Sequence, residues 1–232
     1  MDARTLDIRF MLRPAVTLPP GEVLDEGFFA RPSHVVAPAL VGKILWRRGV
    51  GGGRLVEVEA YLPVGDPACH AHRGITPRNR VMFGPPGRVY VYVSYGLHIM
   101  LNLVCDREDL GSAVLVRAFE PLEPTALLRY NRADALGALP LETVAAGPGR
   151  VGQALGLDLS WNGRELGDGS GEEGILVLDD GYGVAVETTS RIGVSEGGEL
   201  ELRYILPGSR FLSRAPRRGT PRSPEARGKE QG

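Results

Sequence analysis

Cysteine is scarce in this sequence of 232 residues, which contains only Cys69 and Cys105 and no CxxC pair. Two isolated cysteines cannot supply a disulfide framework or the paired thiolates of a structural zinc site. We therefore expect both to be small buried residues. A chain of this length can instead form a substantial hydrophobic core.

Long hydrophobic runs are also missing. No stretch approaches the roughly 18 consecutive apolar residues that a membrane-spanning helix needs. Charged residues interrupt the first 14 positions, where a signal peptide would carry its apolar segment: Asp2, Arg4, Asp7, Arg9 and Arg13. We therefore expect a cytoplasmic protein without a membrane partner.

Lysine is rare as well, because only Lys43 and Lys229 occur among 27 basic residues. The formal net charge of −1 hides a polarised chain. Residues 160–202 contain ten acidic and two basic residues, whereas residues 203–232 contain eight basic and two acidic residues. A basic segment can attract a polyanion, although the acidic run is more typical of solvated surface.

The pattern of apolar and polar residues predicts one mixed α/β domain, of the α+β type, with an antiparallel sheet. We expect a flexible N-terminal arm over residues 1–22, the domain over 23–213, and a disordered basic tail over 214–232. Strands are predicted over residues 44–48, 54–61, 88–94, 97–105, 112–119, 175–178 and 200–206.

Turn and capping residues indicate where the other elements begin and end. A helix is predicted over 33–41, with Ser33 as its cap and Gly42 as its stop. Further helices are expected over 123–132 and around 151–155, and turns at Gly51–Gly53 and Tyr95–Gly96. The segment 63–87 shows little periodicity, which is typical of a functional loop.

Two carboxylates on the predicted strand 54–61 are the first candidates for chemistry. Strict alternation would place Glu57 and Glu59 on one face with Leu55 and Tyr61. Arg117 interrupts the apolar run 114–119, so a buried pair of glutamate and arginine would explain both observations. The pattern alone favours a structural salt bridge and leaves a catalytic carboxylate as the alternative.

The predicted hairpin carries a second set of candidates. Tyr95 falls at its turn, where an aromatic side chain can act as a wedge between stacked bases, but the pattern alone favours an ordinary cross-strand aromatic cluster. Asn102 lies on the face of His98 and Met100. A buried amide needs a structural partner or the edge of a ligand.

A metal site is a weaker interpretation of the sequence. The motif Cys69-His70-Ala71-His72 contains zinc-ligating residue types, but neither a second cysteine pair nor an HExxH helix accompanies it. The signature of zinc deaminases is absent. The segment 147–150 lacks the GK[ST] of a phosphate-binding loop. We therefore expect no metal and no cofactor.

Five segments in a fixed order resemble the alkyladenine DNA glycosylase family, also called 3-methyladenine or N-methylpurine DNA glycosylases. They are VEVEAY at 56–61, DPACH at 66–70, TPRNRVMF at 76–83, GRVYVYVSYG at 87–96 with Asn102, and LVRAFEP at 115–121. The likeness runs from about residue 28 to residue 213 and includes RIGV at 191–194. The order is specific, so the resemblance favours the functional interpretations given above.

The resemblance implies a role for each matching position. Glu59 matches the base that activates the attacking water, while Arg117 and the backbone of Val194 match the groups that hold this water. Tyr95 matches the residue that intercalates into the duplex. The implied base pocket comprises Tyr61, His70, Tyr92, Asn102 and Leu115. Implied DNA contacts are Thr76, Arg78, Met82, Leu97, His98 and Arg150.

The resemblance further implies a curved antiparallel sheet with a protruding hairpin and peripheral helices. Its substrate would be double-stranded DNA with alkylated or deaminated purines, such as hypoxanthine, and the enzyme would be a monomer acting at the nucleoid. Glycosylases that also cleave the backbone use an amine, and neither lysine falls within the five segments, so we expect no lyase activity. The alternatives are a lesion-binding module without catalysis and a metal hydrolase built on His70 and His72.

Overall fold

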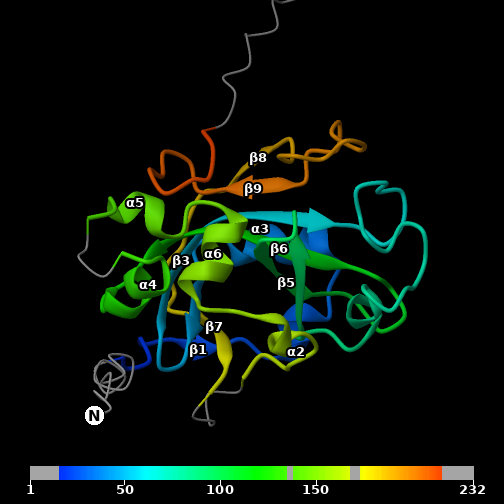
Figure 1. Cartoon of the computed structure of the whole chain (residues 1–232). Helices are drawn as coiled ribbons and strands as arrows, with labels where there is room; N and C mark the ends of the chain where they lie inside the picture. The colour runs from blue at the N-terminus through cyan, green and yellow to red at the C-terminus, as the bar shows by residue number, and fades with distance from the viewer. Residues whose placement is uncertain (1–15, 135–137, 168–172, 216–232) are drawn as a thin grey trace, which may run out of the picture.

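The computed structural model describes residues 16–134, 138–167 and 173–215, and these form one mixed α/β unit around a nine-stranded antiparallel sheet (Figure 1). Along the sheet the order is β1 (Glu22–Val23), β7 (Ile175–Asp179), β2 (Ile44–Arg47), β3 (Gly51–Tyr61), β6 (Ala113–Pro121), β5 (His98–Val104) and β4 (Val89–Ser94). Strand β9 (Arg203–Ile205) pairs with β3 and with β8 (Glu187–Thr189). The predicted fold class is confirmed.

The helices are short and peripheral. They are α2 (Glu26–Phe29), α3 (Ser33–Leu40), α4 (Ala126–Asn131), α5 (Leu141–Val144) and α6 (Pro148–Ala154), with 3-10 turns at Arg80–Phe83 and Leu159–Trp161. Figure 1 shows α4, α5 and α6 gathered on one side of the molecule, opposite the loops that follow β3. No helix within the described ranges is both long and apolar enough to cross a membrane.

The main core lies between the sheet and helices α3 and α6. Val36 and Leu40 of α3 and Val151 of α6 are fully buried against the apolar side chains of β3, β5 and β6. The opposite face of the sheet carries no long helix among the described residues. The loop between β3 and β4 covers it instead, around a smaller cluster that contains Met82 and Tyr90. The main core therefore lies on one face of the sheet, and the loop between β3 and β4 lies on the other.

Strand β3 organises the sheet because it pairs with β2, β6 and β9. A β-bulge at Val56 interrupts its alternation. Leu55 consequently joins Val58 in the main core, whereas Val56 packs against Phe211. The prediction that Leu55 shares a face with both glutamates was wrong, since strict alternation does not hold across a bulge.

Several predicted boundaries also need correction. Gly52 does not lie in a turn but within β3, where a Cβ atom would approach the Leu45 carbonyl oxygen to 1.9 Å. Ser33 does not cap α3, and its hydroxyl donates instead to the Tyr61 carbonyl at 2.9 Å. Helix α4 begins later than expected, and the last strand is shorter than predicted. Both cysteines are buried, as expected.

The predicted arm and tail are described only at their inner ends. Val16 and Leu18 pack against a cluster that contains Trp46. Residues 1–15 and 216–232 lie outside the described residues, so the boundaries at 22 and 213 remain predictions.

Close packing between α6 and β5 generates a test of the fold. An added Cβ at Gly152 would lie 2.1 Å from the Ile99 carbonyl oxygen, so Gly152→Ala should lower the free energy of unfolding by about 1–3 kcal/mol, although alanine normally favours a helix. Urea denaturation measures this difference. The neighbouring change Gln153→Ala removes only an exposed hydrogen bond from Arg132 and should stay within about 1 kcal/mol of the parent. A Gly152→Ala protein as stable as this control would contradict the packing described here.

Candidate active site

A row of side chains crosses the sheet on the face opposite the main core. Glu59 of β3 lies opposite Leu115 of β6, Leu115 lies opposite Asn102 of β5, and Asn102 lies opposite Tyr90 of β4. Directly opposed residues project from the same face of a sheet. The strand register therefore brings a carboxylate, an amide and a phenol together from distant parts of the sequence.

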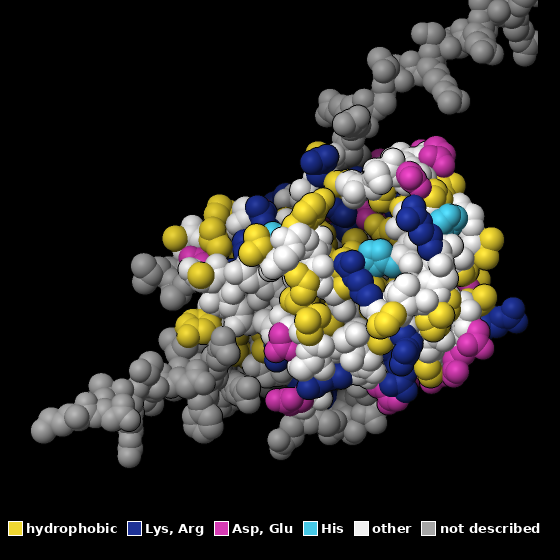
Figure 2. Space-filling model, turned by 45° about the vertical axis from the view of Figure 1, so that its right-hand side comes forward, with side chains coloured by type: hydrophobic (Ala, Val, Ile, Leu, Met, Phe, Trp, Pro, Cys, Tyr) yellow, Lys and Arg dark blue, Asp and Glu magenta, His cyan; other side chains and the backbone are white. Residues whose placement is uncertain are grey.

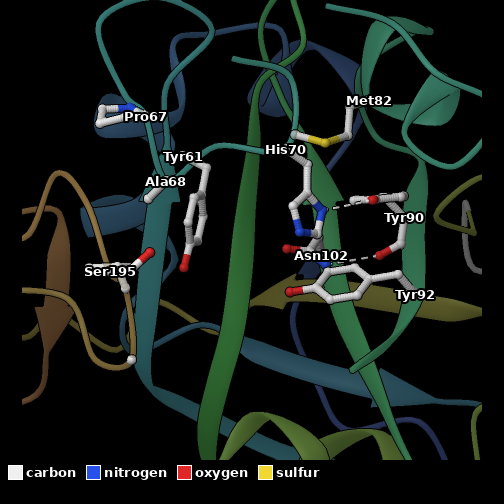
Figure 3. Close-up of a pocket in the computed structure, with 11 residues that line it drawn as sticks. Tyr61, Pro67, Ala68, His70, Met82, Tyr90, Tyr92, Asn102 and Ser195 are labelled. Carbon is white, nitrogen blue, oxygen red and sulfur yellow. Dashed lines mark hydrogen bonds between the residues drawn. The ribbon is translucent and has the colours of Figure 1, made fainter. Parts of the chain in front are cut away.

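A cavity of about 260 Å³ opens above this row. Its walls are Tyr61, Pro67, Ala68, His70, Met82, Tyr90, Tyr92, Asn102, Gly193, Val194 and Ser195. Figure 3 shows Tyr61 facing the rings of His70 and Tyr92 across the cavity. A flat ligand can enter such a slot between aromatic rings.

His70 forms one wall together with two tyrosines. Its Nδ1 atom lies 3.0 Å from the Tyr90 hydroxyl, and its ring meets that of Tyr92 edge-on, with the ring centroids 4.5 Å apart. Burial lowers the pKa of His70, and the charge of Arg78 lowers it further. Both effects favour the uncharged form of the imidazole.

Asn102 forms part of the cavity wall at only 4% exposure. Its side-chain nitrogen donates to the Tyr90 carbonyl at 3.2 Å. This bond fixes the orientation of the amide, so that a ligand meets a rigid polar edge. Leu115 is buried beside it in the row and is not part of the cavity wall.

Glu59 is fully buried and is not part of the cavity wall, but it contacts Tyr61, which is. One carboxylate oxygen accepts from the Ile192 backbone N–H at 2.7 Å. The other accepts from the Tyr61 hydroxyl and from Arg117 Nη1, both at 3.1 Å. The predicted pair of glutamate and arginine is therefore present, and Arg117 also donates to Glu57 at 2.8 Å.

Burial raises the pKa of Glu59 above its ordinary value, and the charge of Glu57 raises it further. Arg117, the Ile192 N–H and the Tyr61 hydroxyl act in the opposite direction, but burial outweighs them. Glu59 is thus a stronger base than an exposed glutamate.

The segment after β8 closes the other side of the cavity. Arg191 makes a bidentate ion pair with Asp66, with both N–O distances at 2.7 Å, and both side chains are fully buried. This pair joins the segment to the loop that follows β3. It places the Ile192 N–H on Glu59 and Val194 in the cavity wall.

The remaining candidates lie outside the cavity, with one exception. Tyr95 and Leu97 at the hairpin tip are 90% and 82% exposed. His98 and Arg150 are exposed as well. They lie near each other, because the His98 ring packs against Gly149 in the first turn of α6. Met82, expected beside DNA, is 2% exposed and belongs to the cavity wall.

The loop between β3 and β4 holds two further candidates at its surface. Thr76 is exposed and bonds to Asn79 through its hydroxyl at 3.0 Å. Arg78 lies over the Tyr92 ring, 5.2 Å from its centroid. On the face drawn in Figure 2, histidine side chains lie beside basic side chains, and acidic side chains lie toward the edges.

Sequence reasoning missed Tyr90 as a wall of the cavity and Arg191 as its support. Tyr90 lies on the same predicted face as Tyr92, which was a usable signal. Arg191 is one of only two basic residues in the acidic segment 160–202, and an isolated arginine there indicates a specific partner. Among the described residues, no three His, Cys, Asp or Glu side chains are grouped as a metal site.

The sequence is similar to known proteins over most of its length. Residues 27–210 match the family model described as Methylpurine-DNA glycosylase (MPG). A protein of Rhodopseudomonas palustris is 44% identical over 204 residues, which cover 88% of this chain and 96% of that protein. One from Burkholderia lata is 41% identical over 200 residues, covering 84% and 92%. Both are named "Putative 3-methyladenine DNA glycosylase".

The buried pair of Asp66 and Arg191 generates a stability prediction. Asp66→Ala leaves a guanidinium buried without its partner, which should cost about 3–5 kcal/mol in the free energy of unfolding. Glu165→Ala breaks an exposed pair with Arg88 and should cost at most about 1 kcal/mol. Urea titration followed by tryptophan fluorescence measures both. Equal losses in the two variants would show that burial does not set the strength of the inner pair.

Proposed function

The chain belongs to the methylpurine-DNA glycosylase family, and we propose that it removes damaged purine bases from double-stranded DNA by hydrolysing the N-glycosidic bond. The observation that carries this proposal is the aromatic slot next to a buried pair of carboxylate and arginine. The slot accommodates a flat base, and the carboxylate can activate water.

The proposed substrate is a purine rotated out of the duplex, since a stacked base cannot reach an enclosed cavity. Tyr61 would stack on one side of the base and Tyr92 with His70 on the other. Alkylated purines carry a positive charge, which electron-rich rings attract. An uncharged His70 does not repel such a base, and Asn102 presents a fixed amide to its edge. Deaminated purines such as hypoxanthine are flat as well and belong to the proposed range.

Glu59 is the proposed general base. Its carboxylate has about four acceptor positions, and Ile192, Tyr61 and Arg117 donate to it, which leaves one acceptor position that the proposed water would occupy. The water oxygen would attack C1′ of the sugar while its proton passes to Glu59, and the base would leave with the electrons of the broken bond. Arg117 and the Val194 backbone would hold the water.

The exposed hairpin tip suits a role in base rotation. A rotated base leaves a gap in the duplex, and filling the gap with an aromatic ring offsets part of the lost stacking, about 1–3 kcal/mol per base. Tyr95 is the proposed wedge, with Leu97 and His98 beside it. Arg78, Thr76 and Arg150 are the proposed contacts to the DNA backbone.

We also propose that the enzyme leaves the abasic strand intact. Strand cleavage by a glycosylase needs an amine that attacks the sugar. Lys43 forms an ion pair with Asp179 at 2.6 Å and does not line the cavity, and Lys229 lies outside the described residues.

Base release from defined duplexes tests the proposed reaction. We expect the natural chain to release 7-methylguanine or hypoxanthine in the presence of a chelator, without nicking the strand before alkali is added. Glu59→Gln should reduce the single-turnover rate by about 10²- to 10⁴-fold, the usual contribution of a general base. The control Glu187→Gln, an exposed change on β8, should leave the rate unaltered.

Each alternative gives a different result in this assay. Tight binding without base release would identify a lesion-binding module. Release that the chelator abolishes would identify a metal hydrolase built on His70 and His72. A strand nicked without alkali would contradict the proposed absence of lyase activity.

The raised pKa of Glu59 generates a prediction for the pH dependence. A general base works only when it is deprotonated, so the rate should fall as the pH drops through the pKa of Glu59. Because burial raises this pKa, the fall should begin at a higher pH than an ordinary glutamate, near 4.3, would produce. Single-turnover rates on a 7-methylguanine duplex measure the profile. A rate that stays constant down to the ordinary glutamate range would contradict this role.

A further inference from the structure

We propose that Glu57, together with Arg203 and Ser213, is a positioning residue that holds Arg117 against Glu59 and sets the basicity of that carboxylate. The inference rests on the proposed hydrolysis by Glu59. It concerns a cluster beside Glu59, and none of its members lines the cavity wall.

Glu57 is fully buried and receives four hydrogen bonds. Arg117 Nε and Arg203 Nε donate to one oxygen at 2.8 and 2.9 Å. The Ser213 hydroxyl donates to the same oxygen at 2.7 Å, and the Ser213 backbone N–H donates to the other at 2.6 Å. Three of these donors share one oxygen and one reaches the other, while Glu57 is fully buried and is not part of the cavity wall. Glu57 is therefore placed to hold other groups and not to contact a bound ligand.

These bonds fix the guanidinium of Arg117 in one orientation. Its Nε donates to Glu57, its Nη1 donates to Glu59, and its Nη2 donates to the Ser213 hydroxyl at 3.3 Å. Each nitrogen therefore has a different partner. Arg117 can turn toward or away from Glu59 only if it breaks its bonds to Glu57 and Ser213.

Arg203 secures Glu57 from the other edge of β3. It lies on β9 opposite Glu59 in the register, and its Nη1 donates to the Thr189 hydroxyl at 3.1 Å. The cluster thus contains two carboxylates and two guanidiniums. Removing one charge from such a buried set leaves an imbalance that the remaining groups must absorb.

The end of the described chain closes this cluster from behind. Ser213 follows Phe211, which is buried against Val56 and Ala118. The Arg214 carbonyl accepts from Arg203 Nη2 at 2.5 Å. The C-terminal segment therefore contributes to the geometry of a site whose other residues begin at β3.

The charge of Glu57 acts on Glu59 directly and through Arg117. The charged and titratable groups around Glu59 are Glu57 and Tyr61 on β3, Tyr92 on β4, Arg117 on β6, Arg203 on β9, and Arg191 in the segment after β8. Burial is the main cause of the raised pKa of Glu59, and Glu57 adds to it while Arg117 opposes it. Without the charge of Glu57, the charge of Arg117 would act on Glu59 unopposed. The pKa of Glu59 would then fall, and Glu59 would become a weaker base.

The test compares variants of the full chain in single-turnover base release from a 7-methylguanine duplex. Glu57→Gln should lower the rate at neutral pH by about 10- to 100-fold, the scale of a displaced catalytic group, with the dissociation constant for the duplex unchanged. The acid limb of its pH–rate profile should move to lower pH. Glu57→Asp keeps the negative charge, so its acid limb should stay where the parent has it. Glu120→Gln removes a carboxylate elsewhere on the sheet and should change neither the rate nor the acid limb.

A second pair of variants covers the case in which Glu57→Gln does not fold. Ser213→Ala removes only the hydroxyl that joins Glu57 and Arg117. It should lower the rate several-fold at unchanged duplex affinity, and Ser213→Thr should restore it.

The inference is overturned if Glu57→Gln, once folded, keeps the rate and the acid limb of the parent, or loses rate while the limb stays in place. It is also overturned if Ser213→Ala matches the parent. These results leave the proposed function standing, because the parent is active in the same assay. A parent that releases no base from any damaged duplex would overturn both.

Discussion

The rest of the site depends on the position of Arg117 between two buried carboxylates. Charges removed from water are costly unless they are paired and hydrogen-bonded, and here the requirement is met only when three strands are in register. Arg117 comes from β6, Glu57 and Glu59 from β3, and the second guanidinium from β9. Strands β6 and β9 both pair with β3 and supply these arginines, and the two-residue spacing of the glutamates turns both carboxylates to the same face of β3. The same constraint therefore fixes the strand order and the orientation of Glu59.

A fold with a core on one face of its sheet leaves the other face available for chemistry. Helices α3 and α6 cover the apolar face, so the site does not have to contribute to the main core. Two irregular segments enclose the polar face, and the ion pair between Asp66 and Arg191 joins them. Because this pair also brings the Ile192 N–H to Glu59, the cavity wall and the environment of the proposed base are parts of one structure.

Much of the sheet could be predicted from period-two patterns, including the hairpin with Tyr95 at its turn. The errors have local physical causes. Gly52 resembles a turn residue but is needed for a close approach to Leu45, and the bulge at Val56 breaks the alternation on which the face assignment relied. The link from Ser213 to Glu57 joins residues 156 positions apart, and no local pattern encodes such a contact. The walls of the cavity were predictable only through a family resemblance, because tyrosines on a strand are as typical of a core.

Burial has opposite effects on two groups of the site, and both effects suit the proposed reaction. It lowers the pKa of His70, which favours an uncharged ring next to the proposed cationic base, and it raises the pKa of Glu59, which makes this carboxylate a better proton acceptor. Burial alone would carry Glu59 towards a neutral acid that could not accept a proton. Arg117 limits the rise and Glu57 limits the influence of Arg117, so the proposed base would stay both ionised and basic. In this view the charge balance of the buried cluster, more than the identity of any one residue, determines whether the proposed enzyme can hydrolyse the N-glycosidic bond of a base bound in the cavity.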